Sequence, residues 1–415
     1  MTLPAKIAEI IAKGVRIAAP FSVEIGEEVS LSRISGQDVV FHSGTKIYGS
    51  QTLISAGVKL GGEGPATVVD CQLGRQVELK GGFFQSSVFL DKAMLASGAQ
   101  VREGTLLEEE TKAGHTVGLK QTILFPFVTL GSLINFCDCL MAGGTGRSDH
   151  SEVGSSYVHF NYTPQQDKAT PSLVGDVPRG VMLDQAPIFL GGQGGMVGPL
   201  RIDYGTVITA GTVWRRDSEG AKLLHGGESR PLRQDYRAGA YGDIRRKVYN
   251  NIRYLANLLA LQQWYLQVRS PFFGKGEMGA ALMAGARDLL GAAIRERLKQ
   301  LGVLTEKMHN SVAIALSQGD GNGDIIRRQR ELAEKWPELE ACFQSPLDDD
   351  DGVRYRDMFL ELLLKQASQK DDYIAAIKAL NADARQAGTQ WLQCIVDRVS
   401  SRALETVPSF RSFLT

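Results

Sequence analysis

The sequence predicts a solenoid of short parallel strands followed by an α-helical domain. Three observations predict this fold: aliphatic residues recur every six positions in the first half, glycine thins after about residue 215, and amphipathic stripes fill the second half. A chain of 415 residues is long enough for two or three domains with sizeable cores.

The six-residue period is carried by three rows of candidate inward-facing residues. These are Leu190, Met196, Ile202, Ile208 and Trp214; Leu124, Leu130 and Phe136; and Phe41, Ile47 and Leu53. A helix cannot keep such a row on one face, and a flat strand alternates with a period of two. Six residues per side, with small residues between them, suit a triangular coil in which each aliphatic side chain stacks on the next coil. An irregular glycine-rich β-sandwich is the alternative.

These patterns divide the chain into successive segments. We predict a short N-terminal helix over residues 1–14, a β-helix over 15–216 with an inserted loop at about 134–160, a polar linker over 217–241 and a helical domain over 242–415. The helical stripes are Ile244, Val248, Ile252, Leu255, Leu259 and Leu266, and Ile374, Ile377, Leu380, Ala384, Trp391 and Ile395. Such stripes indicate a bundle core or an oligomer contact.

Composition and charge argue against several kinds of partner. The 46 basic and 46 acidic residues balance, which argues against a nucleic-acid-binding surface. No run of about 18 apolar residues predicts a membrane span, and the N-terminal MTLPAKIAEIIAKG has no signal-peptide pattern. Five scattered cysteines are typical of thiols in a reducing compartment, so we expect a cytoplasmic protein.

Two segments carry a resemblance to a known family. The first is Lys112-Ala113-Gly114-His115, followed by a coil that starts at Leu124. The second begins at Asn161-Tyr162, has Lys168 shortly after, and continues as IFLGGQGGMVGPLRIDYGTVITAGTV. On these motifs the sequence resembles the hexapeptide-repeat acyltransferases. It is most similar to the acetyltransferase half of the bifunctional glucosamine-1-phosphate acetyltransferase/uridylyltransferase family, which makes UDP-N-acetylglucosamine. The resemblance implies a left-handed β-helix and a homotrimer with active sites between neighbouring rods.

The resemblance also implies an activity, the transfer of an acyl group from acetyl-CoA to an amino sugar, sugar phosphate or nucleotide sugar. His115 stands at the place of the general base that takes a proton from the sugar's amine, a task that suits a neutral imidazole. The positions implied to bind the sugar are Lys112, Asn161, Tyr162 and Lys168, with Arg102 and His159 near the cleft. The positions implied to hold acetyl-CoA are Gly191, Gly192, Ala210 and Gly211 along the coil edge, with Arg215 and Arg216 for its phosphates. Without any ligand, glycines such as Gly191 and Gly192 are also expected at the corners of a coil. Asn161 and Tyr162 are also expected in a turn ahead of Thr163-Pro164.

Several positions depart from the family pattern. Gly118 replaces a sugar-contacting tyrosine and Thr129 a sugar-binding asparagine. Glu103 replaces a phosphate-binding lysine, and Arg102 beside it offers a substitute cation. A glycine-rich LAAGxGTRM phosphate loop is absent from the sequence, so uridylyl transfer is not expected. We expect the insertion at 134–160 to refill a widened sugar cleft and to change the acceptor.

Two other interpretations of the sequence are a metal site and a non-catalytic protein. The first is a metal site built from Cys137-Asp138-Cys139 or from His150 and His159. The spacing fits neither a zinc-binding cysteine pair nor the three shared histidines of γ-class carbonic anhydrases, so no metal is predicted. The second is a non-catalytic protein whose β-helix binds a sugar nucleotide or serves as a scaffold, while the helical domain regulates it or recruits a partner. The departures at Gly118, Thr129 and Glu103 favour this alternative, whereas His115 in its motif favours the enzyme.

Overall fold

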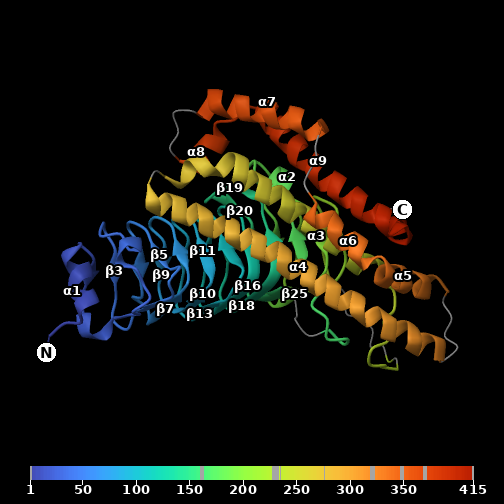
Figure 1. The fold of residues 1–415 in the computed structure, drawn as a ribbon, viewed down its shortest axis with the longest axis horizontal. Coiled ribbons are helices and arrows are strands. Elements are labelled where there is room, and N and C mark those ends of the chain that lie inside the picture. The colour runs from blue at the N-terminus through green and yellow to red at the C-terminus, as the bar shows by residue number, and fades with distance from the viewer. Residues whose placement is uncertain are drawn as a thin grey trace.

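The first half of the molecule is a parallel β-solenoid, and the helices of the second half lie along one side of it (Figure 1). The computed structural model describes residues 2–158, 163–226, 233, 235–274, 276–317, 323–345, 350–367 and 372–413. The predicted fold, a β-solenoid followed by a helical region, is confirmed. The N-terminal helix α1 (Ala5–Ala12) covers one end of the solenoid and buries Ile7 and Ile10 there.

The solenoid has three faces of parallel strands. Face 1 contains β1 (Arg16–Ile17), β3 (Val40–Phe41), β6 (Lys59–Leu60), β9 (Glu78–Leu79), β12 (Met94–Leu95), β15 (Lys112–Ala113), β17 (Thr129–Leu130), β21 (Glu152–Val153), β24 (Phe189–Leu190), β27 (Val207–Ile208) and β29 (Leu223–Leu224). Face 2 contains β2 (Glu24–Ile25), β4 (Lys46–Tyr48), β7 (Ala66–Val69), β10 (Gly82–Gln85), β13 (Ala99–Val101), β22 (Ser156–Val158), β25 (Gly194–Met196) and β28 (Val213–Trp214). Face 3 contains β5 (Leu53–Ile54), β8 (Gln72–Leu73), β11 (Ser87–Phe89), β14 (Thr105–Leu107), β23 (Ser172–Val174) and β26 (Arg201–Ile202). The longer strands β16 (Val117–Leu124) and β18 (Ile134–Met141) bend from face 2 into face 3.

The predicted inward rows form the core of the solenoid. The buried members are Phe41, Ile47, Leu53, Leu124, Leu130, Phe136, Leu190, Met196, Ile202 and Ile208. Trp214, in the last coil, is half-buried. Corners turn through residues with positive φ, such as Gln76 (57°), Gln121 (49°) and Thr116 (58°). The left-handed backbone conformation is unfavourable for most residues other than glycine. At a corner, one such residue turns the chain from one face of the solenoid to the next.

The helical region docks on face 3. Its elements are α3 (Arg245–Trp264), η3 (Tyr265–Arg269), η4 (Ser270–Phe273), α4 (Glu277–Ser317), α5 (Gly323–Glu334), α6 (Trp336–Gln344), α7 (Asp350–Ala367), α8 (Tyr373–Lys378), α9 (Ala382–Thr406) and η5 (Pro408–Phe413). Helix α4 runs beside β5, β8, β11 and β14, and α3 lies beside β23. Ion pairs join the two parts: Arg297 Nη2 lies 2.9 Å from Asp138 Oδ1, and Lys247 Nζ lies 2.8 Å from Asp167 Oδ2.

Two of the expected boundaries are wrong in part. The segment at 134–160 is not a single inserted loop, because β18, β21 and β22 complete regular coils within it. Only the antiparallel hairpin of β19 (Gly144–Gly146) and β20 (Asp149–His150) leaves the coil between β18 and β21. The linker expected at 217–241 is solenoid at its start, where β29 pairs with β27. Polar residues such as Asp138 mark outward and corner positions, where polarity does not interrupt a coil.

Candidate active site along one edge of the solenoid

The edge between face 1 and face 2 gathers polar side chains from successive coils. We call it the His115 edge; its corner residues include His42, Glu63, Ser97, His115 and Ser132, which follow β3, β6, β12, β15 and β17. Because coils stack in register, side chains far apart in the sequence lie one above another along this edge.

His115 is accessible and is held from two sides. Its side chain is 61% exposed, and its Nε2 lies 3.2 Å from Glu63 Oε2. Its backbone N–H donates to Ser132 Oγ at 3.1 Å. Glu63 is itself fixed, because its carboxylate accepts from the Ser97 N–H at 3.0 Å and lies 3.1 Å from Lys80 Nζ. The imidazole therefore has a defined position on an open surface.

The environment of Glu63 keeps it ionised. The hydrogen bond from the Ser97 amide and the contact with Lys80 hold the pKa of the Glu63 carboxyl below its ordinary value. A carboxylate beside Nε2 favours the tautomer in which Nε2 carries the proton, so Nδ1 is left with a free lone pair. That arrangement suits a histidine that accepts a proton from a ligand.

The glycines expected to line the acyl donor lie on the same edge as His115. Gly191 and Gly192 follow β24, and Ala210 and Gly211 follow β27, three and four strands beyond β15 in the order of face 1. At a spacing of about 4.8 Å between strands, Gly191 lies roughly 14 Å along the edge from His115. A Cβ on Gly191 would approach Ala210 N to 2.3 Å, so the close contact between coils requires glycine there whether or not a ligand binds.

The other predicted residues are not brought to His115 within one chain. Arg102 lies on the edge between faces 2 and 3, the Arg102 edge, and Lys168, Arg215 and Arg216 lie on that edge in later coils. All four are exposed. Lys112 is exposed on face 1, between Met94 and Thr129 in the ladder. The predictions for His159, Asn161 and Tyr162 lie outside the described residues.

The departures from the family pattern are distributed over different faces. Glu103 forms an ion pair with Lys120 at 2.6 Å, so this position carries a satisfied anion. Gly118 lies on face 2 between Gln100 and Asn135. Thr129 Oγ1 accepts a hydrogen bond from Arg147 at 3.0 Å.

The hairpin between β18 and β21 lies away from His115. Arg147 in this hairpin donates to the carbonyl oxygens of Glu110 and Phe127, which lie on the edge between faces 3 and 1. Gly146 lies near Lys378 of α8. Within a single chain, this hairpin therefore does not refill a cleft around His115.

Glu63 was not predicted from the sequence. It sits in the long corner Gly61-Gly62-Glu63-Gly64, three strands before β15 on face 1. Counting coils backward from His115 identifies the corners that share its edge. Among these corners, the one that contains Glu63 is unusually long and carries an acid, and this feature could have indicated a partner for His115. The carboxylate of Glu63 contacts His115 from three coils away only because of the shape of this corner. The six-residue period does not predict that shape.

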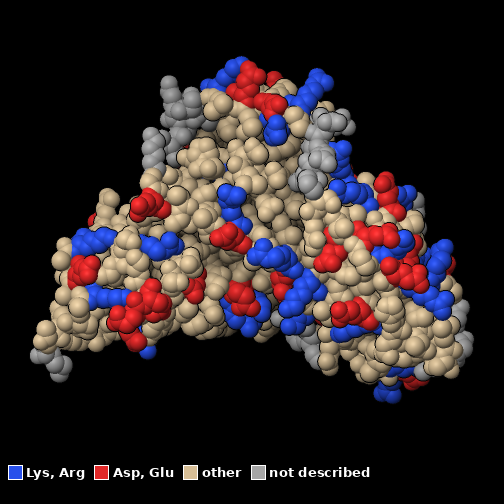
Figure 2. Space-filling view, in the orientation of Figure 1, with Lys and Arg blue, Asp and Glu red and all other residues tan. Residues whose placement is uncertain are grey.

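The described residues also bear on a metal site, a membrane span and the distribution of surface charge. Among the described residues, no group of three or more His, Cys, Asp or Glu side chains is placed to hold a metal ion. Within the same ranges, no helix has the length and apolar character needed to span a bilayer. Figure 2 shows basic and acidic side chains interspersed over the visible face.

The fold and the sequence matches relate the chain to the hexapeptide-repeat acyltransferases. Within that class its relatives are proteins named "Bifunctional protein GlmU". The relative from Thermotoga petrophila is 28% identical over 213 residues, which are 51% of this chain and 42% of that protein. The relative from Corynebacterium aurimucosum is 27% identical over 227 residues, 54% of this chain and 42% of that protein.

The matches cover about half of this chain. The chain spans less than half the length of these curated relatives. No protein-family model matches the sequence. The solved structure of LpxA from Acinetobacter baumannii is 12% identical and covers 67% of this chain and 90% of that chain, with a TM-score of 0.20.

Proposed function

We propose that this protein is an acyl-CoA-dependent acyltransferase that acts on an amino sugar, a sugar phosphate or a nucleotide sugar. The observation that carries the proposal is the pairing of His115 with Glu63 on an exposed edge that also holds Gly191, Gly192, Ala210 and Gly211. Relatedness to GlmU supports it.

The proposed reaction is direct attack by the acceptor's amine on the thioester. The amine nitrogen forms a bond to the carbonyl carbon, and Nδ1 of His115 takes the proton that the nitrogen loses. Glu63 stabilises the resulting imidazolium through Nε2. The carbon–sulfur bond then breaks, and the leaving thiolate takes up a proton. Backbone N–H groups stabilise the oxyanion, but the amide of His115 is engaged with Ser132 and cannot be one of them.

A thiol-release assay tests the proposal. The full chain is incubated with acetyl-CoA and a panel of amino sugars, their phosphates and their nucleotide derivatives, and free CoA thiol is measured over time. We expect release that depends on one acceptor class. If no acceptor on a broad amine panel gives thiol release, the proposal of acyl transfer is rejected.

Glu63→Gln is expected to slow acyl transfer by about two- to fivefold, the usual worth of a partly exposed ion pair. The physical reason is loss of the charge that stabilises the imidazolium and selects its tautomer. The variant should change kcat and leave KM for acetyl-CoA unchanged. Glu24→Gln, which alters a similar exposed pair with Lys46, is the matched control. An equal loss in both variants would remove Glu63 from the mechanism.

We further propose a homotrimer, in which the His115 edge of one copy faces the Arg102 edge of its neighbour. Exposed apolar side chains border the His115 edge: Leu133 is 64% exposed, and Tyr157 on face 2 is 61% exposed. Tyr157, Gly195 and Val213 follow one another in the face 2 ladder. This exposed apolar strip, which includes Leu133, Tyr157 and Val213, is stabilised when another chain packs against it and removes it from water.

Light scattering at micromolar concentration should show three copies per particle. Tyr157→Arg should shift the population toward monomer, because it places a charge in the apolar strip. Leu364→Arg is the control, since Leu364 is 70% exposed on α7, away from face 2. A stable wild-type monomer would contradict this assembly.

A non-catalytic sugar-nucleotide-binding protein is the second candidate. The Glu103–Lys120 pair favours it, because an anion stands where a phosphate-binding cation is expected. Thermal stabilisation separates the two: acetyl-CoA should raise Tm under the first proposal, and only a UDP-sugar should do so under the second. For either function we propose a cytoplasmic location, which rests on the cysteine pattern.

A further inference from the structure

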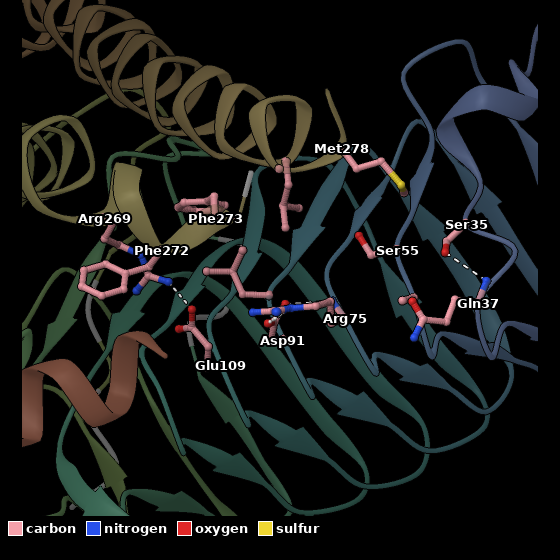
Figure 3. A pocket seen from close by; sticks show the side chains of 15 residues that line it. Ser35, Gln37, Ser55, Arg75, Asp91, Glu109, Arg269, Phe272, Phe273 and Met278 are labelled. Carbon is pink, nitrogen blue, oxygen red and sulfur yellow. Dashed lines mark hydrogen bonds and ion pairs between the residues drawn. The ribbon is translucent and has the colours of Figure 1, made fainter. Parts of the chain in front are cut away.

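A cavity lies at the seam between the solenoid and the helical region, away from His115. It occupies the edge between faces 3 and 1, here called the Glu109 edge, whose corners include Gln37, Ala56, Arg75, Asp91 and Glu109. Its volume is about 340 Å³, and an adjoining cavity of about 510 Å³ shares those five residues. Figure 3 shows Glu109, Asp91 and Arg75 on the solenoid side, opposite Phe272, Phe273 and Met278. Volumes of this size are typical of small-molecule sites.

The inner end of the cavity holds a buried cluster of charges. Arg269, whose side chain is 2% exposed, donates to Glu109 Oε1 and lies 3.6 Å from Glu108 Oε1. The Tyr265 hydroxyl donates to Glu108 Oε1 at 2.5 Å. Two carboxylates thus share one guanidinium. Isolated buried charges are costly, so a cluster with one excess negative charge favours an additional cation.

Three atoms of this cluster have no hydrogen-bond partner among the described residues: Glu109 Oε2, Arg269 Nε and Arg269 Nη1. Glu109 Oε2 is buried and meets no donor among the described residues. Arg269 also has N–H groups without an acceptor, but its guanidinium lies 3.8 Å from the centre of the Tyr373 ring and 4.9 Å from that of Tyr265. Cation–π contacts with these two rings stabilise the guanidinium of Arg269. The carboxylate oxygen is left as an acceptor that needs a donor.

The walls and the rim add two further preferences. Phe272, Phe273, Met278 and Leu282 form an apolar wall opposite the carboxylates. The side chains lining the two cavities include five acids, Asp38, Asp91, Glu109, Glu110 and Asp372, and three bases, Arg75, Lys92 and Arg269. The apolar wall suits a hydrocarbon body, and the excess of acids attracts a positive charge.

We propose that the seam cavity binds an organic ammonium ion with an apolar body, whose ammonium group pairs with the carboxylate of Glu109, a residue that lines the cavity. An ammonium has three donors and no acceptor, which suits an ionised carboxylate, since that group has acceptors only. It also neutralises the second carboxylate of the cluster. The site is separate from the proposed acyl-transfer edge, and its occupancy is measurable without any acyl transfer.

The titration of Glu109 provides an internal check. Burial raises the pKa of Glu109 to about 7, with a smaller raising effect from Glu108 and Asp91 and a lowering effect from Arg269. The other titratable groups around Glu109 and the two cavities are Tyr265, Tyr373, Arg75, Asp38, Lys92, Glu110 and Asp372. At low pH a proton on Glu109 therefore competes with the ligand's ammonium. Affinity should rise about tenfold per pH unit as pH increases toward 7 and then level off.

The experiment uses the full chain and a matched pair of probes, 2-phenylethylamine and 2-phenylethanol, with binding followed by calorimetry. The amine should bind at least about tenfold more tightly than the alcohol, and Glu109→Gln should weaken the amine by about tenfold to a hundredfold and abolish its pH dependence. Glu78→Gln, which alters a surface pair with Lys59, should leave binding unchanged.

Two further results decide the matter. Glu109→Gln keeps the shape of the side chain and leaves Glu108 as the anion beside Arg269, and a melting curve checks that the variant folds. Phe272→Leu should weaken both probes and keep the pH dependence of the amine. Equal binding of amine and alcohol, no binding of the amine, or unchanged amine affinity in Glu109→Gln would each overturn the proposal.

Discussion

Replacing His115 by alanine is expected to lower the rate of acyl transfer by about two to four orders of magnitude, the usual contribution of a positioned general base. The amine must lose a proton as it attacks, and without Nδ1 of His115 that proton passes to water. Thiol release at saturating acetyl-CoA measures the loss. Because the side chain is 61% exposed, its removal should leave the melting temperature nearly unchanged.

His309→Ala is the matched control for this experiment, since His309 is an exposed histidine on α4 and takes no part in the His115 edge. It should retain full activity. Full activity in His115→Ala would keep the protein an acyltransferase and reject the mechanism proposed for it. The double variant Glu63→Gln/His115→Ala should be no slower than His115→Ala alone, because Glu63 acts through the imidazole.

Replacing Arg297 by leucine is expected to lower the free energy of unfolding by about 3–5 kcal/mol, because it breaks a buried ion pair by removing the guanidinium that faces Asp138. Arg297 on α4 and Asp138 at a corner of β18 are 4% and 8% exposed, and their side chains meet at 2.9 Å. Denaturant unfolding followed by circular dichroism measures the change.

The second substitution Asp138→Asn should restore most of the stability lost in Arg297→Leu, since it removes the buried charge that faced Arg297. Arg295→Leu is the control on the same helix; Arg295 is exposed, so the expected change is within about 0.5 kcal/mol. Similar losses for Arg295→Leu and Arg297→Leu would show that the ion pair does not hold α4 on face 3.

The period of the sequence determined the solenoid. A coil with six residues per side buries every member of a six-spaced apolar row. The observed coil does this for Leu190, Met196, Ile202 and Ile208. The helical stripes were determined in the same way, because a spacing of three to four residues puts one face of each helix inward. The expected edge position of Gly191, Gly192, Ala210 and Gly211 agrees with the structure for the same reason.

Only the tertiary structure decided how far each irregular segment leaves the coil. Residues 134–160 were expected to form an inserted loop, although the outward and corner positions of a regular coil accept polar residues such as Asn135 and Asp138. The partnership of Glu63 with His115 was also outside the reach of the sequence. It depends on a carboxylate spanning three coils from a long corner, and the period of six specifies the edge of a residue but not the reach of its side chain.

The docking of the helices, and with it the seam cavity, was likewise decided by tertiary contacts. The stripes of α3 and α4 predict that these helices bury a face, but not which face of the solenoid they cover. That choice depends on charged pairs between distant segments, such as Arg269 with Glu109 and Arg297 with Asp138. The period of a segment determines which way its side chains point within that strand or helix. A contact between two elements depends on the residues of both, and the period of one segment says nothing about the other.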